Sequence, residues 1–271
     1  MYQPAVSDRE FKLYQSFLYE NAGIHITPHK KSLLITRLGK RLRHYGLSSL
    51  GEYYEMIKSD QHHHEMQTMI DLLTTNETYF FREQKHFDYL SSHIKKMPRK
   101  KEAFRVWSAA SSTGEEAYSI AITLADSLGV NGNWEVLGTD INKSVLEHCK
   151  RAVYKNERTE LFPKEYMCRY CLNGVRSRAG SFLIDQQVRK HTQFKQMNLN
   201  DCVWEDNGKF DFIFLRNVMI YFDADVRRRL VDHIAESLKP GGHLFIGHSE
   251  TLSRISDRFH SIRPAIYKRK D

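Results

Sequence analysis

A β-α-β-α pattern that begins at Phe104 is the feature of this sequence that most restricts its fold. Short apolar runs alternate with a small-residue turn and with segments whose apolar residues recur at helical spacing. The predicted elements are a strand at 104–107, a turn at 108–114, a helix to residue 128, a strand at 134–139 and a helix from 144 toward 153. Thr113 and Glu116 have the spacing of a capping box at the start of the first helix. Strands joined through helices form parallel sheets with right-handed crossovers, so we predict an α/β protein with a doubly wound sheet.

Later segments extend this sheet and interrupt it once. Further strands are predicted at 211–215 and 243–247, with a helix at 223–238, a turn at 239–242 and an edge strand within 259–268. Residues 162–195 break the pattern, because Asn173-Gly174 is a strong hairpin signal and short apolar runs follow it. We therefore expect a small antiparallel β-subdomain, inserted at about 162–195.

The length of 271 residues is enough for one medium domain and a smaller one. Residues 1–73 carry only helical patterns, so we predict an all-α N-terminal domain there and the α/β domain at 74–271. No apolar run is long enough to cross a membrane, and the first residues have no apolar signal core. We expect a cytoplasmic monomer without direct membrane insertion.

The cysteines and histidines do not have the spacing of a metal site. Cys168 and Cys171 form a lone CxxC, and Cys149 and Cys202 stand apart, so free reduced thiols are expected. The run His62-His63-His64 lies in a polar stretch and is interpreted as surface. No metal site is predicted.

One N-terminal helix is basic. It begins near Pro28, and no acidic residue occurs from there to Gly51. Arg37, Lys40 and Arg41 lie on an arc beside its apolar face. The whole chain has a net charge of +8, which favours acidic partners without choosing among them. This basic face is either solvated surface or a docking site for an acidic partner, and both interpretations stay open.

The segment from Asn76 to Glu83 combines polar and aromatic side chains. It places a carboxamide, a hydroxyl, a guanidinium and two carboxylates among three consecutive aromatics. Aromatic runs indicate burial, and buried polar groups need partners. A helix start capped by Asn76 or Thr78 is one explanation. The α/β pattern downstream offers another, in which these polar groups bind a ligand of the sheet.

Three polar sites fall at the carboxyl ends of predicted strands, where doubly wound sheets bind ligands. They are the turn at 108–115, Asp140 and the tripeptide Leu215-Arg216-Asn217. The turn is not a GxGxxG sequence, so a pyrophosphate is not indicated. Asp140 has the position of acids that bind ribose hydroxyls. A nucleoside ligand without a pyrophosphate cradle indicates S-adenosylmethionine, and with it a methyltransferase.

Four stretches, in this order, resemble one family. They are Asn76–Arg82, Trp107–Ser119, Gly138–Ile141 and Arg216–Phe222, and they are similar to the CheR family of chemotaxis-receptor glutamate O-methyltransferases. The resemblance implies a Rossmann-like methyltransferase fold with a helical N-terminal domain and a β-subdomain. It implies binding of S-adenosylmethionine, with S-adenosylhomocysteine as product, by Asn76, Thr78, Arg82, Glu115, Asp140, Asn198, Leu199, Arg216 and Asn217. It also implies catalytic roles near the transferred methyl group for Arg82 and Tyr221.

The same resemblance implies partners. The substrates would be acidic cytoplasmic domains of transmembrane chemotaxis receptors, and Arg37, Lys40 and Arg41 are hypothesised to dock them. Whether a C-terminal receptor peptide binds the β-subdomain stays open.

Two other functions agree with part of this sequence. A nucleic-acid methyltransferase suits the basic charge, but residues 216–221 carry no NPPY-like or catalytic cysteine signature, so we expect no nucleic-acid partner. A non-catalytic adaptor that senses S-adenosylmethionine is disfavoured by the intact Arg82 and Tyr221.

Overall fold

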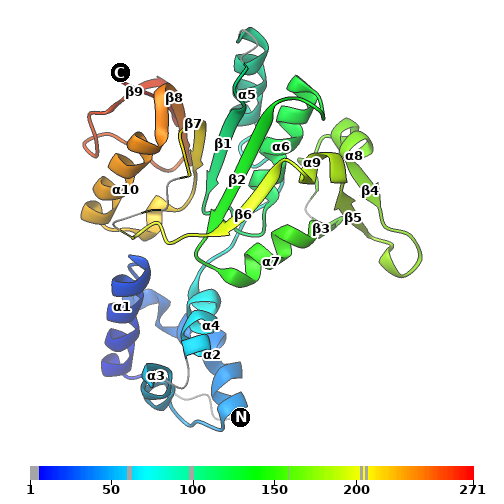
Figure 1. The fold of residues 1–271 in the computed structure, drawn as a ribbon. Coiled ribbons are helices and arrows are strands. Elements are labelled where there is room, and N and C mark those ends of the chain that lie inside the picture. Colours follow the sequence, from blue (N-terminus) through cyan, green and yellow to red (C-terminus); the bar gives the residue numbers. More distant parts are fainter. Residues whose placement is uncertain (1–5, 60–62, 98–100, 158, 202–203, 205–206) are drawn as a thin grey trace.

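The computed structural model describes residues 6–59, 63–97, 101–157, 159–201, 204 and 207–271. A seven-stranded sheet forms the centre of the molecule, and a separate three-stranded sheet projects to one side (Figure 1). The N-terminal helices, blue to cyan, lie below the central sheet in this view. The predicted combination of an all-α N-terminal domain, an α/β domain and a small antiparallel sheet is confirmed.

The N-terminal domain is built from amphipathic helices around a core of its own. Its elements are α1 (Asp8–Ala22), η1 (Pro28–Lys30), α2 (Lys31–Tyr45), α3 (Leu50–Lys58) and α4 (His63–Leu73). Ser7 and Glu10 form a capping box at the start of α1, which satisfies N–H groups that would otherwise lack partners. Tyr14, Leu38 and Tyr53 have no exposed surface and lie in the core.

The central sheet has the strand order β6-β2-β1-β7-β8-β10-β9, and its first five strands run parallel. The strands are β1 (Phe104–Ala109), β2 (Trp134–Asp140), β6 (Thr192–Gln196), β7 (Phe210–Leu215), β8 (Leu238–Ile246), β9 (Phe259–Arg263) and β10 (Ile266–Arg269). The chain runs outward from β1 through β2 to β6, then returns to place β7 and β8 on the other side of β1. The sheet is therefore doubly wound, as predicted, with its switch point between β1 and β7.

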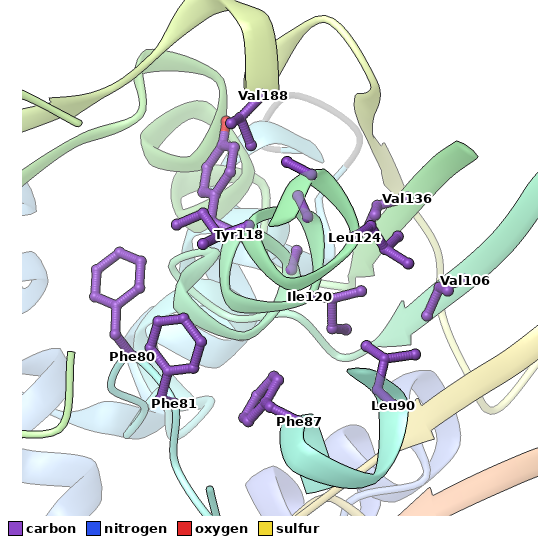
Figure 2. Close-up of a cluster of buried hydrophobic side chains, with 14 of the residues drawn as sticks. Phe80, Phe81, Phe87, Leu90, Val106, Tyr118, Ile120, Leu124, Val136 and Val188 are labelled. Carbon is purple, nitrogen blue, oxygen red and sulfur yellow. The ribbon is translucent and has the colours of Figure 1, made fainter. Parts of the chain in front are cut away.

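Helices cover both faces of this sheet. They are α5 (Lys85–Lys96), α6 (Glu115–Leu128), α7 (Lys143–Arg151), α10 (Ala224–Ser237) and the short η4 (Met219–Tyr221). Successive strand residues point to opposite faces, so Val106 lies in the core under α5 and α6, whereas Trp107 lies in the core under α10. Figure 2 shows part of the first core, in which the Phe80, Phe81 and Phe87 rings lie along one side of α6.

The small sheet has the antiparallel order β3-β5-β4. Its elements are β3 (Val153–Lys155), α8 (Lys164–Tyr170), β4 (Cys171–Asn173), η3 (Arg176–Arg178), β5 (Ser181–Ile184) and α9 (Gln186–Arg189). The antiparallel subdomain is confirmed, but its strands differ from the prediction. β3 precedes residue 162, and β6, which was expected inside the insertion, pairs with β2 in the central sheet. A short apolar run predicts a strand, but it does not show which sheet supplies the partner.

The C-terminal stretch was predicted as one edge strand and forms a hairpin instead. β9 and β10 pair antiparallel around Pro264 and Ala265. Pro264 has no N–H to donate, and Ala265 has a left-handed φ of 61°, so the chain turns at these residues. The turn predicted at 239–242 lies within β8, where the pairing with β7 shifts register.

Cys149, Cys168 and Cys171 have free thiols, whereas Cys202 lies outside the described residues. His62 and the His63 side chain also lie outside them. Within the described part of the chain, no helix is both long and apolar enough to cross a membrane.

Candidate functional site

A cavity of about 260 Å³ lies at the carboxyl ends of the central strands, between the sheet and the N-terminal domain. Most of the predicted site residues line it: Asn76, Thr78, Arg82, Asp140, Asn198, Leu199, Arg216, Asn217 and Tyr221. Ile24, Ile26 and Lys30 of the N-terminal domain form part of its wall. Glu115 lines a neighbouring cavity, which lies on the other side of the Asn76–Tyr79 segment.

The turn after β1 brings backbone N–H groups to Asp140. Ala110 and Ser112 have left-handed φ angles of 64° and 50°, which non-glycine residues rarely adopt. This conformation lets the Ser112 N–H donate to Asp140 Oδ2 over 2.8 Å, while the Asn142 N–H donates to Oδ1 over 2.9 Å. Sparsely populated backbone conformations gather at ligand sites, and this turn follows that rule.

The helix after this turn begins differently from the prediction. Gly114 is the N-cap of α6, with a φ of 97°, and no side-chain cap bond is present. The prediction of a Thr113–Glu116 capping box was therefore wrong. Thr113 donates to the carboxylate of Glu115 instead, which leaves Glu116 to face the sheet. A Cβ atom at position 114 would lie 2.8 Å from Cys149 Sγ, so α6 starts where only glycine fits.

Asp140 is a buried acid with unused acceptor capacity. It is 7% exposed, and burial raises its pKa, although the hydrogen bonds from Asn142 and Ser112 oppose that shift. Each carboxylate oxygen has two lone pairs, and one backbone N–H occupies only one of them. The buried Ser111 hydroxyl, on the same cavity wall, has no hydrogen-bond partner in the described structure. Both groups suit a ligand that carries hydroxyls and heterocyclic nitrogens.

Arg216 sits at the centre of a buried ion-pair network. Its side chain is 2% exposed and lies 2.9 Å from Glu116 Oε2 and 3.1 Å from Glu83 Oε2. It also donates to the Arg82 carbonyl oxygen. Burial raises the pKa of Glu116 against the opposing charge of Arg216. Burial acts to raise the pKa of Glu83, but the charge and hydrogen bonds of Arg216, together with the hydrogen bond from the His248 N–H, lower it overall.

This network contains two residues that the sequence analysis did not assign to the site. Glu116 was predicted as part of a capping box, and Glu83 only as one of the polar groups of the 76–83 segment, yet both bind Arg216 at the end of β7. The available signal was that a buried arginine at a strand end needs an acidic partner.

Arg82 and Tyr221 lie on the same cavity. The Arg82 guanidinium is 5.6 Å from the Tyr79 ring centre and donates to the Glu77 carbonyl oxygen over 3.2 Å. Tyr79 itself is 37% exposed, so one of the three aromatics expected to be buried is not, whereas Phe80 and Phe81 are. Lys30 Nζ lies 5.4 Å from the Tyr221 ring centre, so Lys30 adds a third cationic side chain to the cavity beside Arg82 and Arg216.

Two of the three basic residues predicted on the face of α2, Arg37 and Arg41, bind groups within the N-terminal domain. Arg37 Nη1 donates to the carbonyl oxygens of Leu72, Leu73 and Thr74 over 3.3, 2.9 and 2.7 Å. Arg41 makes a paired contact with the carboxylate of Glu65, with N–O distances of 2.7 and 2.6 Å.

These contacts change the expected roles of the basic residues. Arg37 caps the end of α4, Arg41 stabilises a half-buried ion pair, and only Lys40 is exposed. The pattern located the arc correctly but did not reveal the acceptors beneath it.

Hydrogen bonds join the two domains around the cavity. Asn198 Nδ2 donates to the Asn21 carbonyl oxygen over 2.8 Å, and the His25 N–H donates to the Tyr221 carbonyl oxygen over 2.8 Å. Asp71, near the end of α4, accepts from the N–H groups of Lys143 and Ser144 at the start of α7. The N-terminal domain is therefore a wall of the pocket.

Three features define the class of this protein. The sheet is doubly wound, an acid ends β2, and the cavity at the switch point has no glycine-rich pyrophosphate loop. These features are those of an S-adenosylmethionine-dependent methyltransferase. Residues 76–267 match the family model described as CheR methyltransferase, SAM binding domain. Residues 9–74 match the model described as CheR methyltransferase, all-alpha domain. The chain belongs to the CheR methyltransferase family.

Relatives cover nearly the whole chain. It is 41% identical to the chemotaxis protein methyltransferase of Escherichia coli over 94% of this chain and 88% of that protein. It is 37% identical to chemotaxis protein methyltransferase 2 of Pseudomonas aeruginosa, over 95% of this chain and 92% of that one. The solved structure of PKMT2 from Rickettsia typhi has a TM-score of 0.38 and 16% identity over 63% of this chain and 26% of that one, too partial a likeness to support any argument.

Proposed function

We propose that this protein transfers the methyl group of S-adenosylmethionine to glutamate side chains of chemotaxis receptors, giving glutamyl methyl esters and S-adenosylhomocysteine. The main support for this proposal is one cavity lined by Asp140, Arg82 and Tyr221. Asp140 has the position of an acid that binds ribose hydroxyls. The names of the relatives, chemotaxis protein methyltransferases, support receptors as the substrate class.

The substrate needs little activation. A glutamate side chain has a pKa of about 4.3 and is already a carboxylate at neutral pH, so it attacks without a general base. S-adenosylmethionine supplies an electrophilic methyl group on sulfur. The protein's work is then to hold the carboxylate oxygen in line with the methyl carbon, at about 3 Å, and to exclude water.

Arg82 is the residue we assign to orienting that carboxylate. Among the described residues it has no carboxylate partner, because Glu83, the acid next to it, is held by Arg216. A guanidinium can bind both carboxylate oxygens. That contact must remain moderate, since negative charge on the carboxylate declines in the transition state and tight ground-state binding would slow the reaction.

Tyr221 is the second residue we assign to the reacting centre. Its backbone is fixed by the hydrogen bond from His25 of the N-terminal domain, and its ring faces the same cavity as Arg82. It would shape the path of the methyl group and donate one hydrogen bond. Its position therefore depends on the docking of the N-terminal domain.

The cofactor is assigned to the remaining cavity residues. We infer that Asp140 accepts from its ribose hydroxyls and that Asn76, Thr78, Asn198, Leu199, Arg216 and Asn217 complete the contacts. The unpartnered Ser111 hydroxyl on this wall suits the same ligand. Glu115 would reach the methionine ammonium only if the Asn76–Tyr79 segment between the two cavities moves.

The docking surface for acidic receptor segments is the exposed part of α2. Lys40, Arg43 and His44 point to solvent, and no ion pair is described for Lys40 or Arg43 within the structured ranges. We therefore centre the predicted docking on Lys40, with Arg37 and Arg41 shaping the helix that presents it. Unpaired basic groups raise the rate of encounter with an acidic coiled coil.

We propose the β-subdomain as a second binding place, for a receptor peptide. β4 is an edge strand that pairs only with β5, and the nearby Leu172 and Val175 are 53% and 72% exposed. An extended peptide can add to such an edge. Deleting the receptor's C-terminal residues tests this contact separately from the reaction.

The experiment that tests the function uses S-adenosylmethionine with a labelled methyl group, receptor-containing membranes, and nucleic acid as a competing acceptor. We expect base-labile label on receptor glutamates. Label on nucleic acid would support a nucleic-acid methyltransferase, and cofactor binding without any transfer would support a sensing adaptor. Either result would overturn the proposal.

A further inference from the structure

Three potential metal-ligand side chains meet beside Arg216, which lines the cofactor cavity. Glu83 precedes α5, His86 lies in its first turn, and His248 follows β8, far away in the sequence. One ligand atom from each lies within 4.8 Å of the other two. Glu83 Oε2 is 3.5 Å from His86 Nδ1 and 4.0 Å from His248 Nε2.

The His86 side chain is buried without a hydrogen bond in the described structure. It is 1% exposed, and neither ring nitrogen has a hydrogen-bond partner in the described structure. An unpaired buried polar group costs free energy, and such groups usually mark a missing ligand. The imidazole makes T-shaped contacts with the rings of Phe245 and His248, whose centres lie 5.5 and 5.2 Å from its own.

Two imidazoles and one carboxylate form a donor set that suits Zn²⁺ and similar ions. Metal–ligand bonds of about 2.0–2.2 Å in a tetrahedral site place ligand atoms roughly 3.4 Å apart. The Glu83–His86 distance of 3.5 Å already meets this requirement. The His248 side chain is 50% exposed and can swing inward, while water would take the fourth position.

The neighbouring arginine does not prevent binding. Glu83 Oε2 accepts from Nε and Nη2 of Arg216, but Glu116 holds Nη1 of the same guanidinium. Arg216 therefore keeps an acidic partner when Glu83 turns toward a metal ion. It would still lose two bonds, and Nη2 also holds the Arg82 carbonyl.

We propose that Glu83, His86 and His248 form a binding site for one divalent transition-metal ion such as Zn²⁺, and that its occupancy weakens cofactor binding by drawing Glu83 away from Arg216. The metal binding is independent of the proposed substrate. The effect on the cofactor rests on Arg216 and Arg82, which line the cavity.

Binding is measured with chelator-treated protein, Zn²⁺ and a chromophoric zinc competitor, without receptor. The test variants are His248→Gln, at an exposed side chain, and His86→Phe, which keeps a ring against Phe245. The matched control is His64→Gln, because His64 is an exposed member of the histidine run at 62–64. Thermal melts establish that each variant folds.

We expect one Zn²⁺ per chain, affinity reduced at least about tenfold in His248→Gln and His86→Phe, and no change in His64→Gln, since even supporting groups cost that much when lost. Calorimetry should show S-adenosylmethionine binding more weakly with Zn²⁺ present, and this effect should disappear in His248→Gln. No zinc binding, or binding lost only in His64→Gln, overturns the site. Zinc binding with unchanged cofactor affinity overturns the regulatory part alone.

Discussion

Arg37 should stabilise the fold rather than contact the receptor, and a single substitution separates the two roles. Arg37→Met keeps an unbranched apolar side chain but removes the donors to the carbonyl oxygens of Leu72, Leu73 and Thr74. These carbonyls end α4, and the next residues lead into Asn76 at the cavity. The change should therefore loosen the segment that carries the first cofactor contacts.

The magnitude follows from the geometry. All three bonds come from Nη1, which carries two hydrogens, so at most two are strong at once. Each hydrogen bond from a charged donor contributes about 1.5–3 kcal/mol, and half-burial of the guanidinium favours the lower value. We expect Arg37→Met to lower the free energy of unfolding by about 3 kcal/mol.

Lys40→Met is the matched control, on the same helix but exposed. It should change the free energy of unfolding by less than about 0.5 kcal/mol. Urea unfolding followed by circular dichroism measures both variants, and calorimetry measures S-adenosylmethionine affinity. Lys40→Glu should raise the KM for receptor alone, whereas Arg37→Met should also weaken cofactor binding. Equal stability of Arg37→Met and Lys40→Met would refute the reasoning.

Three further outcomes follow from the cavity and the core. Asp140→Asn should raise the Kd for S-adenosylmethionine about 10-fold to 100-fold, because a charged acceptor is lost, and unchanged calorimetry would contradict the ribose assignment. Tyr221→Phe should lower kcat for receptor methylation about 10-fold with cofactor affinity unchanged, and an unchanged kcat would remove the hydroxyl from the mechanism. His243 is buried, and burial lowers its pKa to about 3, so the unfolded state takes up a proton first as the pH falls below about 6.5. Stability should therefore decline from that pH downward, and less steeply in His243→Phe; identical slopes in acid titrations would argue against this origin.

Helices and strands were predicted correctly where a regular pattern of apolar residues continued over many positions. Residues 104–140 gave β1, α6 and β2 because alternating short runs and a helical stripe leave few arrangements. Prediction failed where pairing partners decide the outcome. β6 was placed in the wrong sheet, and the β9–β10 hairpin was read as one strand, since no local pattern states which neighbour supplies the hydrogen bonds.

The candidate site shows the same division. Residues at strand ends, such as Asp140 and Asn217, were found because parallel strands bring their carboxyl ends together. The network of Arg216 with Glu83 and Glu116 joins residues 133 and 100 positions apart, which spacing rules cannot detect. Arg37 and Arg41 were assigned to a surface because a helical arc shows where a side chain points and not what lies beneath it.

The central claim is that this fold methylates receptor glutamates from S-adenosylmethionine. Its most direct test is mass spectrometry of receptor after incubation with the protein and methyl-labelled cofactor, comparing the wild type with Arg82→Met. The account predicts labelled methyl groups on glutamate side chains, released by mild base, and their loss in Arg82→Met even at saturating cofactor. Label on any other side chain, or equal glutamate labelling by the variant, would contradict it.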